Sequence, residues 1–516
     1  MVSVYFTELK RYKFEEIKKE IDNARKDIST NREEVKYIIQ KLKECQIIKA
    51  ISSISSVQNI SVNNSEEALG ETISDDVFFV FAYVGIIVLG DYVIKCLPKY
   101  ILSPTDEPEN KFKEVVRVIE KYNRIHAPKK RYFNLADGRG GVISNEIALK
   151  VFLLREYYQR GLYKKDRETV EDDGAGEILW EETLETPGFY KDEKIFHIPL
   201  KTIRVDDDDN YFTDLHRSIL TEISKEFDKN KLLDIFNISP VFLTNLSLKQ
   251  FDKTEHIKYM LKREIKVQFV TWKQNLLCAL YAYVCKEKTK SISDRIELFG
   301  TNCFNLVWED VCKNIFVNQL NCKLKDLPGY SAKNAGVDIY KKLSDVIERP
   351  VWRSYSGTKY IADRTFEPDI IGIFPKKDDQ DKFELWILDA KYYVFDWING
   401  KTTIKNQPGV EDIAKQYLYE LVFKNLILKN FSDPYKYDFT YNVFLCPSDS
   451  AKTEIFGCAE IESLKDMIEV SLESVSVVKL DVREMYKIYL DESINKDCTK
   501  LLENLRDGLR SFYESA

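Results

Sequence analysis

Histidine is scarce in this sequence, and its cysteines lack the spacing of a metal-binding module. The chain of 516 residues contains four histidines and ten cysteines, with no CxxC pair and no cysteine at ligand spacing from a histidine. Zinc sites are built from such closely spaced nitrogen and sulfur ligands. The sequence therefore argues against a zinc site. It favours a reducing compartment, in which unpaired cysteines serve as small buried side chains.

Long hydrophobic runs are also missing. The one long apolar stretch is Val77–Gly90, and its fourteen residues are too few to span a bilayer. Its β-branched and aromatic residues predict a buried strand. Residues 1–50 are charged and helical in character, which is not typical of a secretory signal peptide. We expect a soluble, cytoplasmic protein with no membrane partner.

An excess of positive charge is absent as well. The chain carries 84 acidic and 77 basic side chains, which gives a net charge of −7. A free-standing DNA-binding protein would more often be basic. DNA binding needs only a local basic groove, so the acidity does not exclude a DNA substrate. It indicates that another subunit supplies part of any contact with DNA.

The sequence has no nucleotide-binding motif. Asp137–Gly141 is rich in glycine, but it lacks the Gly-Lys-Ser/Thr ending of a phosphate-binding loop, and no predicted strand precedes it. No Walker motif occurs elsewhere in the chain. We therefore expect any hydrolysis of nucleoside triphosphates to come from a partner.

The strongest pattern in the chain is a predicted hairpin. Two apolar, β-rich runs, Asp369–Phe374 and Phe383–Tyr393, are joined by a charged turn, Pro375–Asp381. When the runs pair as an antiparallel hairpin, Asp369 lies opposite residues 387–389, to within two positions. Side chains alternate along a strand, so Asp389 and Lys391 share one face. Two carboxylates and one ammonium group thus converge on one patch of sheet.

This group of side chains suits metal-dependent hydrolysis. Carboxylate oxygens are the ligands that Mg²⁺ prefers, and the bound ion polarises a phosphodiester and activates water. The ammonium group of Lys391 can orient the water or stabilise charge on the phosphoryl oxygens. The alternative is a surface ion pair. However, Asp389 follows the apolar run Leu385–Leu388. Charges at the end of a buried strand cost desolvation energy, so they are expected there only if they serve a function such as metal binding. The residues therefore favour a metal site.

The same residues match a family pattern. Pro368-Asp369 followed by Asp389-Ala390-Lys391 resembles the PD-(D/E)XK nuclease core, in which these positions bind Mg²⁺ and activate water. Three flanking segments look like the LlaJI-type restriction endonucleases, which are similar to McrC, the nuclease partner of a GTP-driven AAA+ motor. These segments are FGTNCFNLVWEDVCKNIF (299–316), RPVWRSYSG (349–357) and QPGVEDIAKQYLYEL (407–421). The resemblance covers residues 299–480 well and the N-terminal half loosely.

The resemblance implies a mixed sheet with helices on both faces, a double-stranded DNA substrate and Mg²⁺ as the cofactor, with Mn²⁺ as a substitute. It also implies an AAA+ GTPase partner similar to McrB, and a homodimer is a further option. The sequence thus predicts the nuclease subunit of a bacterial restriction system that acts in phage defence. Two alternatives stay open: an autonomous site-specific endonuclease, and an inactive DNA-binding or scaffold subunit.

A further acidic residue lies on a predicted helix. Apolar residues recur at a period of 3.6, and Glu309 lies at the edge of their stripe whereas Asp310 points away. The stripe consists of Phe304, Val307, Trp308, Val311, Cys312, Ile315 and Phe316. In related nucleases an acid from this helix often completes the metal shell. We therefore nominate Glu309 as a third ligand, against the alternative of a residue at the rim of the core.

Side chains after the hairpin are candidates for contact with the scissile strand. Lys415, Gln416 and Tyr419 lie near the start of a predicted helix, Glu411–Lys429, where related nucleases often place such groups. Packing in the core is an equal alternative for these three residues.

Basic residues upstream of the hairpin are candidates for contact with phosphates. Arg349, Arg353, Lys359 and Arg364 lie on chain expected to be extended and close to the metal site. Scattered surface charge is the alternative. Trp352 among them is expected to be a buried anchor.

The chain as a whole predicts the α/β (α+β) class, with three consecutive segments. Residues 1–135 form an α+β unit with a helix from Asn31 to Ile48 and a hairpin that turns at Gly90-Asp91. This unit is either a winged-helix-like domain that recognises DNA or protein, or a packing or partner-binding unit. Residues 136–294 are mostly helical, and Asp206–Asp209 is expected to form a solvated turn. Residues 295–516 form the nuclease domain, with further strands at Thr440–Cys446 and Val475–Val482.

Overall fold

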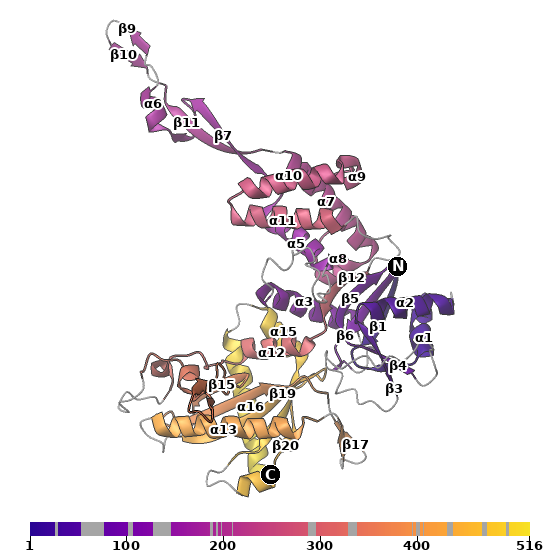
Figure 1. Cartoon of the computed structure of the whole chain (residues 1–516), viewed down its shortest axis with the longest axis vertical. Coiled ribbons are helices and arrows are strands. Elements are labelled where there is room, and N and C mark those ends of the chain that lie inside the picture. Colours follow the sequence, from indigo (N-terminus) through magenta and orange to yellow (C-terminus); the bar gives the residue numbers. More distant parts are fainter. Residues whose placement is uncertain are drawn as a thin grey trace. The chain divides into compact units, whose positions relative to one another are not determined.

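Two compact units make up the chain in the computed structural model (Figure 1). One unit comprises Met1–Ser3, Ile86–Ile94 and His126–Phe299, and the other comprises Val4–Gly85, Lys95–Ile125 and Gly300–Ala516. The structure describes residues 1–25, 29–52, 77–101, 107–126, 146–185, 189–191, 194–197, 199–208, 210–286, 296–328, 338–394, 396–398, 403–405, 407–430, 437–466, 472–491 and 495–515. These two units reflect how densely residues contact one another, and they do not test which parts fold independently. The expected division into three consecutive segments therefore stays a prediction.

A mixed five-stranded sheet forms the centre of the second unit. Its order is β15-β16-β19-β21-β20. β16 pairs antiparallel with β15 and parallel with β19, β21 pairs parallel with β19, and β20 pairs antiparallel with β21. The strands are β15 (Ile370–Pro375), β16 (Phe383–Ala390), β19 (Tyr437–Ser448), β20 (Glu454–Ala459) and β21 (Val475–Asp481). The expected mixed sheet, its hairpin and both further strands are confirmed.

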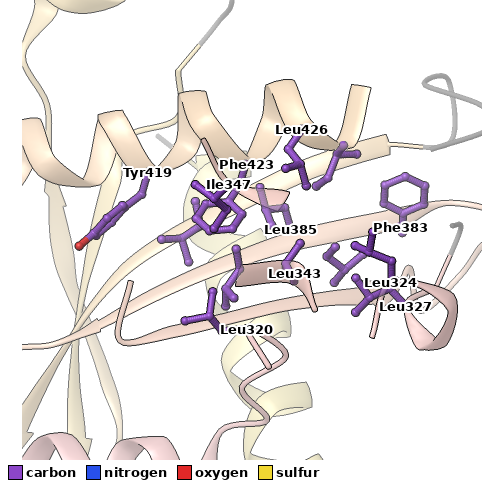
Figure 2. Packing of buried hydrophobic residues seen from close by; sticks show 14 residues of the cluster. Leu320, Leu324, Leu327, Leu343, Ile347, Phe383, Leu385, Tyr419, Phe423 and Leu426 are labelled. Atoms are coloured by element: carbon purple, nitrogen blue, oxygen red, sulfur yellow. The ribbon is translucent and has the colours of Figure 1, made fainter. Parts of the chain in front are cut away.

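Helices cover both faces of this sheet. On one face, Tyr419 and Phe423 of α13 pack with Leu385 of β16, as Figure 2 shows. On the other face, Glu384 of β16 is buried and accepts a hydrogen bond from Arg510 of α16. The helices of this region are α12 (Phe304–Ile315), α13 (Val410–Asn430), α14 (Glu462–Asp466), α15 (Val482–Leu490) and α16 (Asn495–Ser515). Because β16 is covered on both faces, it is apolar along most of its length. The α/β class is confirmed.

The N-terminal part of the chain is α+β, as expected. Asn31 caps α2 by accepting from the backbone N of Glu33, and the apolar run from Val77 divides into β4 and β5. Gly90 has a positive φ of 56° in the turn between β5 and β6. The elements are β1 (Val2–Thr7), β2 (Arg11–Tyr12), α1 (Phe14–Ala24), α2 (Arg32–Glu44), β3 (Ile48–Ser52), β4 (Val77–Phe81), β5 (Val84–Leu89), β6 (Tyr92–Leu97) and α3 (Pro108–His126). Their strands form one sheet of order β2-β4-β3 and, together with β12 (Ile296–Thr301), another of order β1-β6-β5-β12.

The middle of the chain is mostly helical, but it also contains strands that the sequence did not predict. Its helices are α5 (Glu146–Arg160), α6 (Trp180–Glu185), α7 (Tyr211–Lys229), α8 (Leu232–Phe236), α9 (Leu248–Phe251), α10 (Thr254–Val267) and α11 (Thr271–Lys286). Its strands are β7 (Lys165–Asp172), β8 (Glu177–Ile178), β9 (Phe189–Lys191), β10 (Lys194–His197) and β11 (Lys201–Asp208). The turn expected at Asp206 is wrong, because β11 continues to Asp208 and pairs there with β7. Asp137–Gly141 lies outside the described residues.

Short elements complete the second unit. They are the 3₁₀ turns η3 (Leu324–Asp326) and η4 (Leu343–Val346) and the strands β13 (Val351–Arg353), β14 (Lys359–Ile361), β17 (Asp396–Ile398) and β18 (Thr403–Lys405). Leu324 and Leu343 from the two turns join the apolar cluster beneath α13 (Figure 2). Within the described part of the chain, no helix is both long and apolar enough to cross a membrane.

A buried hydrogen bond joins the segment after β1 to the segment after β16. The hydroxyl of Tyr392 donates to Oε2 of Glu8 over 2.5 Å, and both atoms accept from the backbone N of Lys99, at 3.2 Å and 3.3 Å respectively. Burial raises the pKa of Glu8, although these hydrogen bonds and the charge of Lys99 oppose the increase. Tyr392, the residue next to Lys391, is thus fixed to Glu8, which is distant in sequence and follows β1 directly.

Replacement of Tyr392 by phenylalanine is expected to destabilise the protein. The change leaves the buried Glu8 without its closest donor, which costs about 1–3 kcal/mol of unfolding free energy. Urea unfolding measures the effect, and Tyr340→Phe is the matched control because Tyr340 is exposed. Equal unfolding midpoints for the two variants would show that the hydrogen bond contributes nothing.

Candidate metal centre

The strand register places the two predicted carboxylates opposite each other. Ile370 pairs with Leu388, so Asp369 lies opposite Asp389 one position further towards the open end of the hairpin, away from its turn. The backbone N of Ala390 donates to Oδ2 of Asp369 over 3.0 Å. Because alternate side chains share a face, Asp369 and Asp389 both lie on the face that α13 covers, at the end of the apolar rows. The expected register is confirmed.

Lys391 lies just beyond β16 and binds two carboxylates. Its backbone N donates to the carbonyl oxygen of Leu445 over 2.9 Å, which extends the pairing with β19 by one residue. Its Nζ lies 3.0 Å from Oδ2 of Asp389 and 2.7 Å from Oδ1 of Asp412, in the first turn of α13. The side chain is 13 % exposed, so the ammonium group is held in place and still borders solvent.

Gln416 lies one helical turn after Asp412 and, like Lys391, contacts the carboxylate of Asp389. Its Nε2 donates to Oδ2 of Asp389 over 2.9 Å, and the residue is fully buried. Its Oε1 is buried and has no hydrogen-bond partner among the described residues. A buried amide oxygen without a donor is costly, and such atoms call for an explanation. A ligand bound beside Asp389 would provide one.

The two aspartates have opposite pKa shifts. Burial, then a hydrogen bond with Asp389 and the negative charges of Asp389 and Glu309, raise the pKa of Asp369 to about 7. Burial also opposes ionisation of Asp389, but the charge of Lys391 and hydrogen bonds from Asp369, Lys391 and Gln416 keep its pKa low. The pKa of Lys391 is raised, because the two aspartates that it binds outweigh its burial. Without a metal ion, the aspartate pair therefore shares a proton.

The pair fits a divalent cation. Two carboxylates within hydrogen-bonding reach of each other repel when both are ionised, and a bound cation relieves that repulsion. Among the residues that the structure describes, no group of three or more histidine, cysteine, aspartate or glutamate side chains is arranged to hold a metal ion. The groups that could hold a cation are thus the two carboxylates, and Mg²⁺ commonly takes its other ligands from water and phosphate oxygens.

Glu309 lies near the pair but binds a lysine. Its carboxylate forms an ion pair with Lys313, whose Nζ also lies 3.9 Å from Oδ1 of Asp369. The apolar stripe of α12 is buried as predicted, and Nε1 of Trp308 donates to the carbonyl oxygen of Leu445 over 3.0 Å. This bond fixes α12 at the end of the sheet that carries the pair. The role of Glu309 as a metal ligand stays a prediction.

Two charged residues of the site were not nominated from the sequence. Asp412 precedes Gln416 by one helical turn, and Lys313 follows Glu309 by one turn. A search for opposite charges at i,i+4 from each nominated residue on its helix would have found Lys313. Asp412 has no such signal, because its partner Lys391 lies on another element.

The three residues nominated near the start of α13 have different environments. Lys415 is exposed, with its Nζ 5.4 Å from the ring centre of Tyr419. Tyr419 is 3 % exposed, and its hydroxyl donates to the carbonyl oxygen of Glu367 over 3.0 Å, which favours the packing alternative. Gln416 is also buried, against Asp389. Only Lys415 of the three is open to a DNA strand.

The upstream basic residues are exposed, and the expectation for Trp352 is wrong. Arg349, Arg353 and Arg364 are exposed on or beside the β13–β14 hairpin. Trp352 on β13 is 68 % exposed, because no described part of the chain covers this hairpin. It is therefore not a buried anchor.

All residues of the candidate site lie within the part of the chain that a family model matches. The model of the LlaJI restriction endonuclease matches residues 83–483. The chain belongs to the LlaJI restriction endonuclease family. This LlaJI-family chain is also 26 % identical over 460 residues to the type II restriction enzyme BsuMI component YdjA of Bacillus subtilis (strain 168), which covers 88 % of each chain.

Two solved structures show a weak overall likeness to the LlaJI-family chain. One is a half-complex from the assembly of Thermococcus gammatolerans McrB AAA+ hexamers with bound McrC, at 14 % identity, a TM-score of 0.39, and coverage of 99 % of this chain and 100 % of that one. The other is the McrBC complex of the same organism, at 14 % identity, a TM-score of 0.26, and coverage of 61 % and 86 %. Scores this low carry no argument about function.

Removal of the Asp369 carboxylate is expected to stabilise the metal-free protein at alkaline pH. Its pKa rises from 3.8 to about 7 on folding, so the folded chain holds a proton that the unfolded chain releases, and its contribution to stability is lost as pH rises through that window. At pH 8, Asp369→Asn should raise the unfolding free energy by about 1–3 kcal/mol.

Urea unfolding in EDTA at pH 5 and pH 8 tests this expectation, with the exposed Asp363→Asn as the control. The stabilisation by Asp369→Asn should be larger at pH 8. The same effect at both pH values would contradict a shared proton in the pair.

Proposed function

We propose that this chain is the nuclease subunit of a bacterial restriction system and hydrolyses phosphodiesters of double-stranded DNA with Mg²⁺. The observation that carries the proposal is the convergence of Asp369, Asp389 and Lys391 at one end of a buried hairpin. Membership of the LlaJI restriction endonuclease family supports DNA as the substrate. The pattern of the three residues supports the PD-(D/E)XK superfamily.

The roles of the residues follow from their contacts. Asp369 and Asp389 would hold Mg²⁺, with Mn²⁺ as a substitute, and the bound ion would polarise the phosphodiester and lower the pKa of water. Lys391, fixed between Asp389 and Asp412, orients the attacking water or stabilises negative charge on the phosphoryl oxygens. Gln416 fixes the orientation of the Asp389 carboxylate through its amide.

Glu309 and Lys313 serve the same centre in this proposal. Lys313 contacts the carboxylates of both Glu309 and Asp369, so it partly balances their charge when no metal is bound. Glu309 would then be a further ligand, directly or through water. Its place on the rigidly anchored helix α12 and its effect on the pKa of Asp369 support this role.

We further propose that an AAA+ GTPase similar to McrB drives cleavage. The chain has no Walker motif, and its net charge of −7 suggests that another subunit supplies part of the contact with DNA. The resemblance to McrC-like nucleases supplies the kind of partner. A homodimer of the nuclease subunit is compatible with this assembly.

Loss of Asp389 or Lys391 is expected to abolish cleavage. Asp389→Ala removes a metal ligand, and Lys391→Ala removes the group that orients water, so the rate of Mg²⁺-dependent nicking should fall at least about 100-fold for each. Plasmid nicking in the reconstituted system measures the rate. Asp379→Ala, in the exposed turn of the hairpin, is the control and should cleave normally. Cleavage retained by either site variant would refute the proposed centre.

Cleavage is expected to depend on the motor. The purified chain with Mg²⁺ alone should nick DNA slowly, and addition of the neighbouring gene product that carries Walker motifs, with GTP, should raise the rate. A non-hydrolysable GTP analogue should not, because the motor would then lack its energy source. A rate that is the same with and without the motor would favour an autonomous endonuclease.

A further inference from the structure

The β13–β14 ribbon, residues 349–364, is a closed hairpin directly upstream of Asp369. Trp352 pairs with Tyr360, and Arg353 pairs with Lys359. At the tip, the backbone N of Ser354 donates to the carbonyl oxygen of Thr358 over 2.9 Å. The ribbon is therefore a regular hydrogen-bonded hairpin with a defined register.

Both faces of this ribbon are exposed. Its side chains alternate, so Trp352 and Tyr360 lie on one face whereas Arg353 and Lys359 lie on the other. Trp352 is 68 % exposed, Tyr360 is 57 % exposed, and Tyr355 at the tip is fully exposed. A two-stranded hairpin without cover on either face is marginal by itself, and exposed aromatic side chains in such numbers mark a binding surface.

The charge of the ribbon is positive within an acidic chain. Residues 349–364 contain four basic side chains and one acidic one, Asp363, whereas the whole chain has a net charge of −7. None of Arg349, Arg353 and Lys359 forms a salt bridge with another residue in the described part of the chain. The charge of the ribbon thus complements a polyanion.

We infer that the β13–β14 ribbon enters a groove of duplex DNA next to the scissile phosphate. The inference rests on the proposed nuclease function and deepens it. The major groove is about 12 Å wide and admits a two-stranded β-ribbon. A groove surrounds a ribbon on two sides, which matches two exposed faces, whereas a flat protein partner would cover one. The basic side chains contact phosphates, and Trp352 and Tyr360 contact sugars and base edges.

The base of the ribbon is fixed to the frame of the metal centre. Oγ1 of Thr365 donates to the carbonyl oxygen of Glu348 over 2.7 Å, which closes the base. The hydroxyl of Tyr419 holds the carbonyl oxygen of Glu367 over 3.0 Å. Asp369 follows Arg364 by five residues, so their Cα atoms lie at most about 18 Å apart. DNA that reaches the aspartate pair therefore passes close to the ribbon.

The test measures binding of the full-length chain to a labelled DNA duplex by fluorescence anisotropy, in EDTA and over a range of salt concentrations. For Arg353→Ala with Lys359→Ala, the slope of log K against log salt should become less steep by about 1.8, and affinity at 0.1 M salt should fall about 60-fold, because two phosphate contacts are lost. Arg353→Lys with Lys359→Arg keeps both charges and should keep the wild-type slope.

The aromatic side chains give an independent measurement. Trp352→Ala with Tyr360→Ala should lower affinity about five- to tenfold, from partial loss of apolar burial, with the slope unchanged. These side chains are exposed, so thermal unfolding and Mn²⁺ binding should match wild type in every ribbon variant. Tyr259→Ala, which removes an exposed tyrosine elsewhere, should bind DNA like wild type.

Two results would overturn the inference while leaving the nuclease function intact. One is wild-type affinity and salt slope for the Arg353→Ala, Lys359→Ala variant of a chain that cleaves DNA. The other is loss of binding to the AAA+ partner with unchanged DNA binding, which would make the ribbon a protein interface. A wild-type chain that neither binds nor cleaves DNA would instead refute the nuclease function, and the ribbon inference with it.

Discussion

Repulsion between the buried carboxylate of Asp389 and the partly buried carboxylate of Asp369 is the constraint around which the second unit is arranged. The hairpin register places Asp369 opposite Asp389 on a face that is otherwise apolar, where burial makes a second negative charge expensive. The surrounding chain offsets this cost with Lys391 and Gln416 on Asp389, and with Lys313 and a raised pKa on Asp369. A folded protein gains nothing in stability from such a pair, so the pair indicates function.

The rest of the fold holds these groups in place. α13 contributes apolar side chains along most of one face and polar ones, Asp412 and Gln416, at the end where the carboxylates lie. α12 is fixed to the carbonyl oxygen of Leu445, which also accepts from the backbone of Lys391. One carbonyl on β19 thus positions both the helix that carries Glu309 and Lys391, the lysine of the proposed centre. Supported in this way, the site has the rigid frame that the proposed hydrolysis would require.

The parts of the fold that were predictable are those in which local pattern and packing agree. The alternation and turn length of the hairpin predicted its register to within two positions, and the 3.6-residue stripe of α12 matched its buried face. β11 was missed because its end pairs with β7, where Asp206 lies opposite Arg167 and Asp208 lies opposite Lys165 about forty residues away, and no local pattern shows this. Trp352 was misjudged for a related reason: an aromatic side chain indicates burial only if its element is covered.

The most direct test of the account is the position of a metal ion in a crystal. In crystals of the chain soaked in Mn²⁺, the anomalous difference map should show a peak bonded to an oxygen of Asp369 and an oxygen of Asp389, with Lys391 beside it. No peak between the two aspartates at saturating Mn²⁺, with Lys313 still bound to Asp369, would contradict the proposed centre.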